Sequence, residues 1–167
     1  MPRHLSTASL ALPVIGCAII CWPAPASAQT AKDLVGTWEF VSIVNTAKDG
    51  TKTEPFGSNL KGLFIMGPDG RFAQIVTRAA IPKFASDNRL QGTPEENKAI
   101  VQGSIGYFGT YSVDNKVLTL HVEGGTWPSW TGTAQKRAIT SYTTDQLTWT
   151  LEASVGGSNV TTVKRVK

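Results

Sequence analysis

Residues 29–167 contain no cysteine, because the two cysteines of the chain, Cys17 and Cys21, both lie near the N-terminus. This region also contains only His121, since the other histidine of the chain is His4. A domain formed by residues 29–167 therefore has no disulfide to stabilise it and no thiol for catalysis. A metal site is not expected either, because such sites combine several histidine or cysteine ligands. Stability must come from an apolar core.

The N-terminus has the layout of an export signal. A short basic start is followed by an uncharged apolar stretch, Ala8–Trp22, then by two prolines and the small-residue series Ala26–Ala28. A membrane-spanning helix needs about 20 apolar residues, and this stretch is shorter. The sequence therefore predicts a signal peptide over residues 1–28 with cleavage after Ala28. Residues 29–167 would then form a periplasmic or secreted domain with no membrane span.

One alternative concerns Cys17. The series from Val14 to Cys17 resembles the lipobox of bacterial lipoproteins, in which the cysteine is lipidated and becomes the first residue. The stretch that follows it, Ala18–Trp22, is unusually apolar for a lipoprotein tether. This composition favours cleavage after Ala28 over lipidation of Cys17.

The charge of the chain argues against a nucleic-acid partner. The chain has 16 basic and 12 acidic residues, and loss of Arg3 with the signal would lower the formal net charge from +4 to +3. The remaining charges are spread along the chain without a basic run. Nucleic-acid-binding domains concentrate Lys and Arg in a patch or stripe, so no such partner is expected.

Short segments rich in Val, Ile, Thr and aromatic residues recur between turn signals, which is typical of an all-β sandwich or barrel. Few windows have the period of a helix. The pattern predicts eight strands, at approximately residues 37–44, 62–66, 71–77, 107–113, 116–123, 133–142, 146–152 and 159–166. The short turns between consecutive strands indicate an antiparallel meander.

Three local signals refine this pattern. Gly67–Gly70, with the sequence Gly-Pro-Asp-Gly, predicts a tight hairpin, because proline presets one turn dihedral and glycine adopts a positive φ. Thr93 followed by Pro94 and Glu96 predicts the start of one short helix. The long segment 78–92 before it is either a lid over a binding site or a cover for one open end.

An open sheet of eight antiparallel strands exposes two edges, whereas a closed barrel exposes none. We therefore expect a single all-β domain, an eight-stranded antiparallel up-and-down barrel with one short helix. A barrel of this size is either filled by its own side chains or holds one small ligand. Which of these two states applies decides the function.

The start of the first expected strand, Gly36-Thr37-Trp38, resembles the G-x-W signature of lipocalins, and Arg165 stands where lipocalin-type barrels place a basic residue across that tryptophan. Such a cation–π contact contributes about 0.5 to 2 kcal/mol. A longer series is more specific, and it comprises residues 36–40, 55–57, 62, 69–71, 78, 84–86, 92–96, 109–111, 113–114, 121–123, 128, 130, 132, 135 and 137. In order and spacing, this series is similar to the bacterial and fungal lipocalin-like domain family.

The resemblance covers essentially all of residues 29–167. It implies a small calycin-type barrel with an internal pocket, and for most members of the family the ligand is unassigned. The family often has two adjacent histidines before Val-Glu, where this chain has Leu120 and His121. A function that needs a histidine pair is therefore not expected, and the resemblance describes the fold better than the function.

His121 is the natural general acid or base near neutral pH. Strand alternation places Leu118, Leu120 and Val122 in one row and His121 with Glu123 in the other, and the apolar row is the more natural inward face. This alternation favours a structural or surface role for His121. A polar group in the pocket and a catalytic group are the alternatives.

Gln135 and Arg137 share one face of the expected strand 133–142, and alternation alone does not decide whether that face enters the barrel. A buried arginine needs a carboxylate partner, which Glu123 on the neighbouring strand could supply. The functional alternative is that Arg137 binds the anionic head of a ligand.

Aromatic residues complete the set of candidates. Trp127 and Trp130 lie in a loop between two expected strands, where they either rim the barrel mouth and contact a ligand or plug one end as core. Tyr107 and Tyr111 share a face and suit either pocket lining or barrel filling.

The ligand-binding candidates are therefore Tyr107, Tyr111, His121, Trp130, Gln135 and Arg137. The sequence has no Ser-His-Asp set with informative spacing and no phosphate loop, so we expect no catalytic residue, metal or cofactor. The leading hypothesis is an exported barrel that binds a small, largely apolar molecule. The alternatives are a cyclase or isomerase that uses the barrel pocket, and a filled barrel that serves as an envelope or interaction module. The sequence carries no signal for an oligomeric state.

Overall fold

The computed structural model of the chain describes residues 30–152 and 156–167. The expected signal peptide, its cleavage site after Ala28 and the alternative lipidation site Cys17 lie outside the described residues. Within them, no helix is both long enough and apolar enough to cross a membrane.

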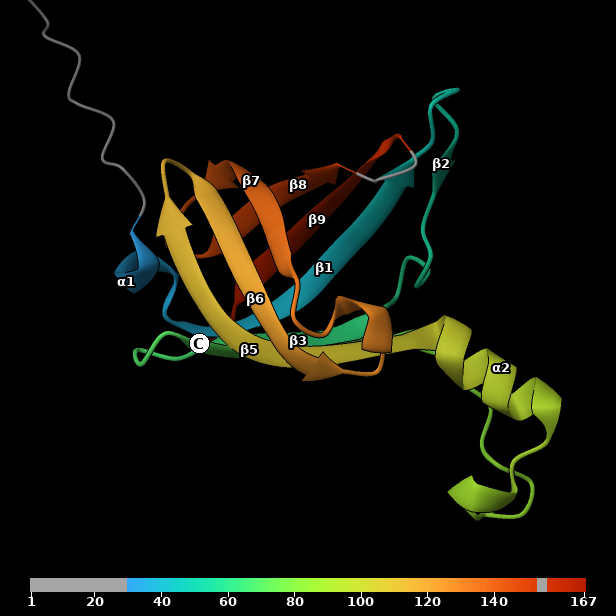
Figure 1. Ribbon diagram of the computed structural model, residues 1–167. Coiled ribbons are helices and arrows are strands. Elements are labelled where there is room, and N and C mark those ends of the chain that lie inside the picture. The colour runs from blue at the N-terminus through green and yellow to red at the C-terminus, as the bar shows by residue number, and fades with distance from the viewer. Residues whose placement is uncertain (1–29, 153–155) are drawn as a thin grey trace, which may run out of the picture.

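The strands form an antiparallel barrel (Figure 1). In chain order they are β1 (Gly36–Thr46), β2 (Lys52–Thr53), β3 (Lys61–Met66), β4 (Arg71–Thr77), β5 (Ser104–Asp114), β6 (Val117–Gly125), β7 (Ala134–Tyr142), β8 (Gln146–Glu152) and β9 (Ser158–Arg165). β1 and β3 to β9 pair in that order, and β9 returns to pair with β1 from Trp38 to Thr46. The expected eight-stranded barrel is confirmed, and β2 is a two-residue addition beside the end of β1.

The helical segments are α1 (Ala31–Leu34), α2 (Pro94–Gly103) and the 3-10 turns η1 (Arg89–Gln91) and η2 (Pro128–Trp130). The helix expected after Thr93 is α2. Its first turn has the predicted cap, because the Thr93 hydroxyl accepts a hydrogen bond from the Glu96 N–H and the Glu96 carboxylate accepts one from the Thr93 N–H. Figure 1 shows α2 projecting away from the barrel beyond β5. The segment 78–92 lies against α2, where the Ala85 N–H donates to the Glu96 carboxylate at 2.8 Å.

The hairpin between β3 and β4 has the expected turn. Gly70 has a φ of +78°, which glycine adopts without the steric cost that a side chain would add. The Gly67 N–H donates to the Arg71 carbonyl at 2.7 Å and closes the turn.

Inward-facing side chains pack one end of the barrel. As expected from strand alternation, Leu118, Leu120 and Val122 of β6 are buried. The largest fully buried side chains are Trp38 from the first half of β1, Phe64 and Met66 from the end of β3, and Leu34 from α1. We call this end of the barrel, which α1 covers, the closed end.

Arg165 connects the segments that form the closed end. Its guanidinium carbon lies 4.1 Å from the centroid of the Trp38 ring, so the expected cation–π contact is present. The same guanidinium donates hydrogen bonds to the carbonyls of Thr144 at 2.6 Å, Val35 at 2.6 Å and Asp33 at 2.8 Å. Arg165 therefore joins α1, the start of β1 and the turn before β8.

Gly36 makes room for this contact. Its φ is +139°, and a Cβ atom at this position would lie 2.6 Å from an Arg165 guanidinium nitrogen. The glycine of the G-x-W signature is therefore required both by its backbone conformation and by the arginine that packs against Trp38.

We predict that Arg165→Met lowers the free energy of unfolding by about 2 to 4 kcal/mol, because it removes three charge-assisted hydrogen bonds and the contact with Trp38. Urea denaturation followed by tryptophan fluorescence measures this change. Lys164→Met is the matched control, because Lys164 precedes Arg165 on β9 but forms an exposed ion pair with Glu39. The control should lose less than about 1 kcal/mol, and equal losses in both variants would contradict the assignment.

Candidate functional site

The end of the barrel opposite α1 contains a pocket of about 300 Å³. Ligand pockets typically enclose about 300 to 1,000 Å³, so this one suits a small molecule. Most of its lining is apolar or aromatic, from Phe40, Ile43, Pro55, Phe56, Val76, Ile105, Tyr107, Trp127, Trp130, Trp149 and Leu151. Five polar residues complete it, namely Asn45, Gln74, Arg137, Asn159 and Thr161. The barrel is therefore filled at one end and hollow at the other.

Two tryptophans from the loop between β6 and β7 contribute to the pocket wall. Trp127 and Trp130 stack with ring centroids 4.7 Å apart and an interplanar angle of 15°. Trp130 also meets Tyr107 edge to face, at 5.1 Å and 89°. Trp127 is half exposed and Trp130 is half-buried, so the pair lies at the mouth of the pocket. This position corresponds to the rim that the sequence offered as one of two alternatives.

Arg137 is the charged residue in the wall of this pocket, and only 3% of its surface is exposed. Its Nη2 donates to the Tyr107 hydroxyl at 2.6 Å, and its Nη1 donates to the backbone carbonyl of Gln135 at 3.2 Å. Its guanidinium carbon lies 6.0 Å from the Tyr107 ring centroid. Across the described ranges, no carboxylate lies within ion-pair distance of Arg137.

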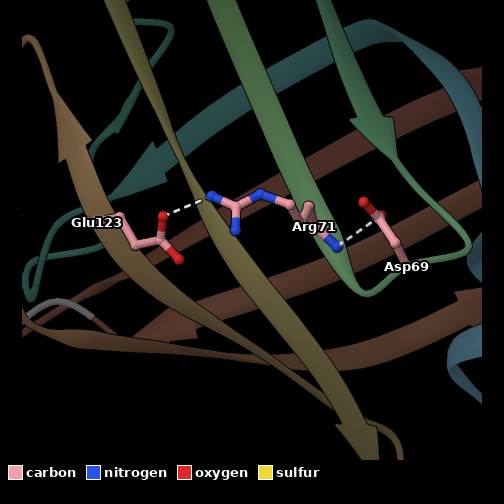
Figure 2. Close-up of polar contacts among 3 residues, drawn as sticks. All are labelled: Asp69, Arg71 and Glu123. Atoms are coloured by element: carbon pink, nitrogen blue, oxygen red, sulfur yellow. Dashed lines mark hydrogen bonds and ion pairs between the residues drawn. The ribbon is translucent and has the colours of Figure 1, made fainter.

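The proposed pairing of Arg137 with Glu123 is wrong. Glu123 instead forms an ion pair with Arg71, with 2.6 Å between its carboxylate and a guanidinium nitrogen (Figure 2). The Arg71 backbone N–H also donates to Asp69 at 3.1 Å. Strand alternation explains the difference, because Glu123 lies in the outward row of β6 whereas Arg137 lies in the inward row of β7.

The structure brings together three of the sequence-predicted candidates, Tyr107, Trp130 and Arg137. His121 is exposed in the outward row of β6 and does not line the pocket. Tyr111 points inward but lies at the closed end, where its hydroxyl donates to the Gly67 carbonyl at 2.9 Å.

Gln135 shares the inward row of β7 with Arg137 but is not among the residues that line the pocket at the open end. Its side-chain amide donates to the Thr133 hydroxyl at 2.8 Å. Its backbone carbonyl nevertheless holds one side of the Arg137 guanidinium. Gln135 therefore orients Arg137 rather than facing the pocket itself.

Sequence reasoning missed Gln74, which lies in the inward row of β4 between Phe72 and Val76. It is 9% exposed, and its side-chain oxygen is the buried side-chain atom without a hydrogen-bond partner among the residues that the structure describes. Gln74 is paired across the sheet with Tyr107. The sequence feature that could have identified Gln74 is its polar side chain in the otherwise apolar alternating row of β4.

A second missed group of polar residues crosses from β1 to β9. The Asn159 amide donates to the Asn45 side-chain oxygen at 2.7 Å, and the Thr161 hydroxyl donates to the Asn159 side-chain oxygen at 2.8 Å. These hydrogen bonds pair the side chains of Asn45, Asn159 and Thr161 with one another, so the three residues form a neutral part of the pocket wall.

Burial raises the pKa of the Tyr107 hydroxyl above its ordinary value of 10.0, and the positive charge of Arg137 opposes this only in part. Tyr107 is therefore protonated throughout the neutral range. Its hydroxyl accepts a hydrogen bond from Arg137 and keeps its own proton to donate.

The raised pKa of Tyr107 predicts a dependence of stability on alkaline pH. Because the folded state holds this proton to a higher pH than the unfolded state, the stabilisation is complete below about pH 10 and is lost as the pH rises further. The free energy of unfolding should therefore fall less between pH 9 and pH 11 in Tyr107→Phe than in the wild type. Urea denaturation at several pH values measures the two slopes, and identical slopes would contradict the raised pKa.

Comparisons with known proteins identify the family of this chain. A model of the lipocalin-like domain matches residues 35–164. A search of curated proteins finds no significant match. Similar solved structures include a redesigned β-barrel, b11L5F_LGL, with a TM-score of 0.45 and 15% identity over 84% of this chain and 98% of that one.

Two further designed barrels are similar to this chain. A de novo designed fluorescence-activating β-barrel has a TM-score of 0.40 and 14% identity, over 81% of this chain and 96% of that one. The redesigned barrel mFAP1, bound to DFHBI, has a TM-score of 0.40 and 21% identity, over 81% of this chain and 97% of that one. Because the family model extends from the residue before β1 into β9, this chain belongs to the lipocalin-like domain family.

Proposed function

We propose that this protein is exported and binds a small, largely apolar molecule in the open half of its barrel. The observation that carries the proposal is the pocket of about 300 Å³ within a barrel whose other end is packed. The proposal of export is based on the signal-like sequence of residues 1–28.

The lining of the pocket favours an apolar ligand. Aromatic and aliphatic side chains, among them Phe40, Ile43 and Trp149, cover most of its wall. Apolar surface removed from water stabilises a complex by about 25 cal/mol per Å². At about 300 Å³, the pocket lies at the small end of the range that is typical of ligand sites. A molecule with one or two rings matches this volume.

The geometry gives less support to the two alternatives. A filled barrel would leave no interior space, whereas this barrel has a pocket at its open end. A cyclase or isomerase would act in the same pocket, but His121, the natural acid or base of the sequence, lies on the outer face of β6 and cannot serve it. Ligand binding is therefore the function that the site supports best.

We predict that Val76→Trp strongly weakens binding, because Val76 is 1% exposed and lines the pocket, so the larger tryptophan side chain would occupy part of it. The neutral fluorophore prodan is a suitable probe, since its emission increases when it leaves water. The wild type should bind prodan saturably, and Val76→Trp should weaken this binding at least tenfold.

The control variant is Ile75→Trp, which places the same ring one residue earlier in β4. Ile75 is 54% exposed on the outer face, so this variant should bind prodan as the wild type does. Thermal melting of both variants establishes that they are folded. Absence of saturable binding to the wild type, together with no small molecule in native mass spectra of the purified protein, would refute the proposed function.

A further inference from the structure

We propose that the ligand of this pocket carries a carboxylate, and that Arg137 and Tyr107 bind this group. The inference rests on the proposed function and adds the chemical class of the ligand. It therefore describes a small carboxylic acid whose remaining part is apolar.

The charge of Arg137 has no opposite charge beside it within the described residues. Moving a guanidinium out of water is costly, so buried charges in proteins are normally paired with an opposite charge. Arg137 is 3% exposed, and in the described part of the chain its polar contacts are neutral, the Tyr107 hydroxyl and the Gln135 carbonyl. An anion that enters the pocket would supply the missing opposite charge.

Arg137 also has hydrogen-bond donors that its protein contacts leave free. A guanidinium has five N–H groups in a planar fork, and two of them are used in the hydrogen bonds to Tyr107 and Gln135. These two contacts fix the orientation of the side chain before a ligand arrives. The fork matches the two oxygens of a carboxylate, which it binds through parallel charge-assisted hydrogen bonds.

Two polar neighbours of Arg137, Tyr107 and Gln74, line the same pocket. Tyr107 accepts a hydrogen bond from Arg137, so its own proton is free to donate to a ligand oxygen. Gln74 is paired with Tyr107 across β4 and β5 and lines the same pocket, but its unpartnered amide oxygen accepts hydrogen bonds and therefore does not bind the carboxylate. The donors with unused hydrogen-bonding capacity are those of Arg137 and Tyr107, which lie together in the wall of a mainly apolar pocket.

The apolar part of the ligand would lie against the aromatic wall. Trp130 stands edge to face with Tyr107, and both line the pocket. A flat ring attached to the carboxylate can therefore contact these aromatic faces while its oxygens reach Arg137. A single arginine suits a singly charged carboxylate better than a phosphate, which needs more donors.

The experiment compares a naphthoic acid with the matching naphthamide, which has nearly the same shape but no charge. Titration calorimetry at pH 7 with the purified protein gives both dissociation constants. We expect the wild type to bind the acid at least tenfold more tightly than the amide, because a charge-assisted contact exceeds a neutral one by this amount or more.

Arg137→Met should weaken binding of the acid at least tenfold and leave binding of the amide nearly unchanged. Lys136→Met is the matched control, because it removes the same charge from the neighbouring residue, which is exposed on the outer face of β7. This control should bind both compounds as the wild type does. Tyr107→Phe should weaken binding of the acid by a smaller factor.

The outcomes separate the two proposals. If the wild type binds the amide as tightly as the acid, the carboxylate inference is wrong and the proposed function stands. The same conclusion follows if Arg137→Met binds the acid normally, or if naphthyl phosphate binds more tightly than the acid. If neither naphthyl compound nor prodan binds, the proposed function fails as well. Should Arg137→Met not fold, the acid and amide comparison on the wild type decides.

Discussion

The pairing of β9 with β1 is the interaction on which the rest of the structure depends. It joins residues 38–46 to residues 158–165 and converts a meander of strands into a ring. A closed ring of eight strands has a fixed width, so the inward side chains share an interior of limited volume. The size and polarity of those side chains at each level of the barrel then determine where it is solid and where it is hollow.

The two ends of the barrel differ in this respect. At the closed end, Trp38, Phe64 and Met66 occupy the interior, and Arg165 holds α1 over them. At the open end, the inward rows include polar side chains such as Gln74 and Arg137, which water or a ligand must satisfy. The packed end thus supports a site in which some polar groups, such as Gln74 and Arg137, lack full partners.

The strands could be predicted from the sequence because alternation and turn residues are local signals. The α2 cap at Thr93 was predictable for the same reason, whereas α1 and β2 are too short to have a pattern. Tyr107 and Arg137 were identified as candidates, but their contact depends on the pairing of strands. In the observed register Arg137 faces Leu118, an inward residue of β6, and this non-local pairing determines which face of β7 enters the barrel.

The positions of the chain ends relative to the pocket have a practical consequence. The described chain enters the barrel through α1 and leaves it after Arg165, and both points lie at the closed end (Figure 1). The loop that carries Trp127 and Trp130 lies at the other end. A tag joined directly to Thr30 or to Lys167 would therefore begin at the end away from the mouth. A domain immobilised through such a tag would present its open end to the solution.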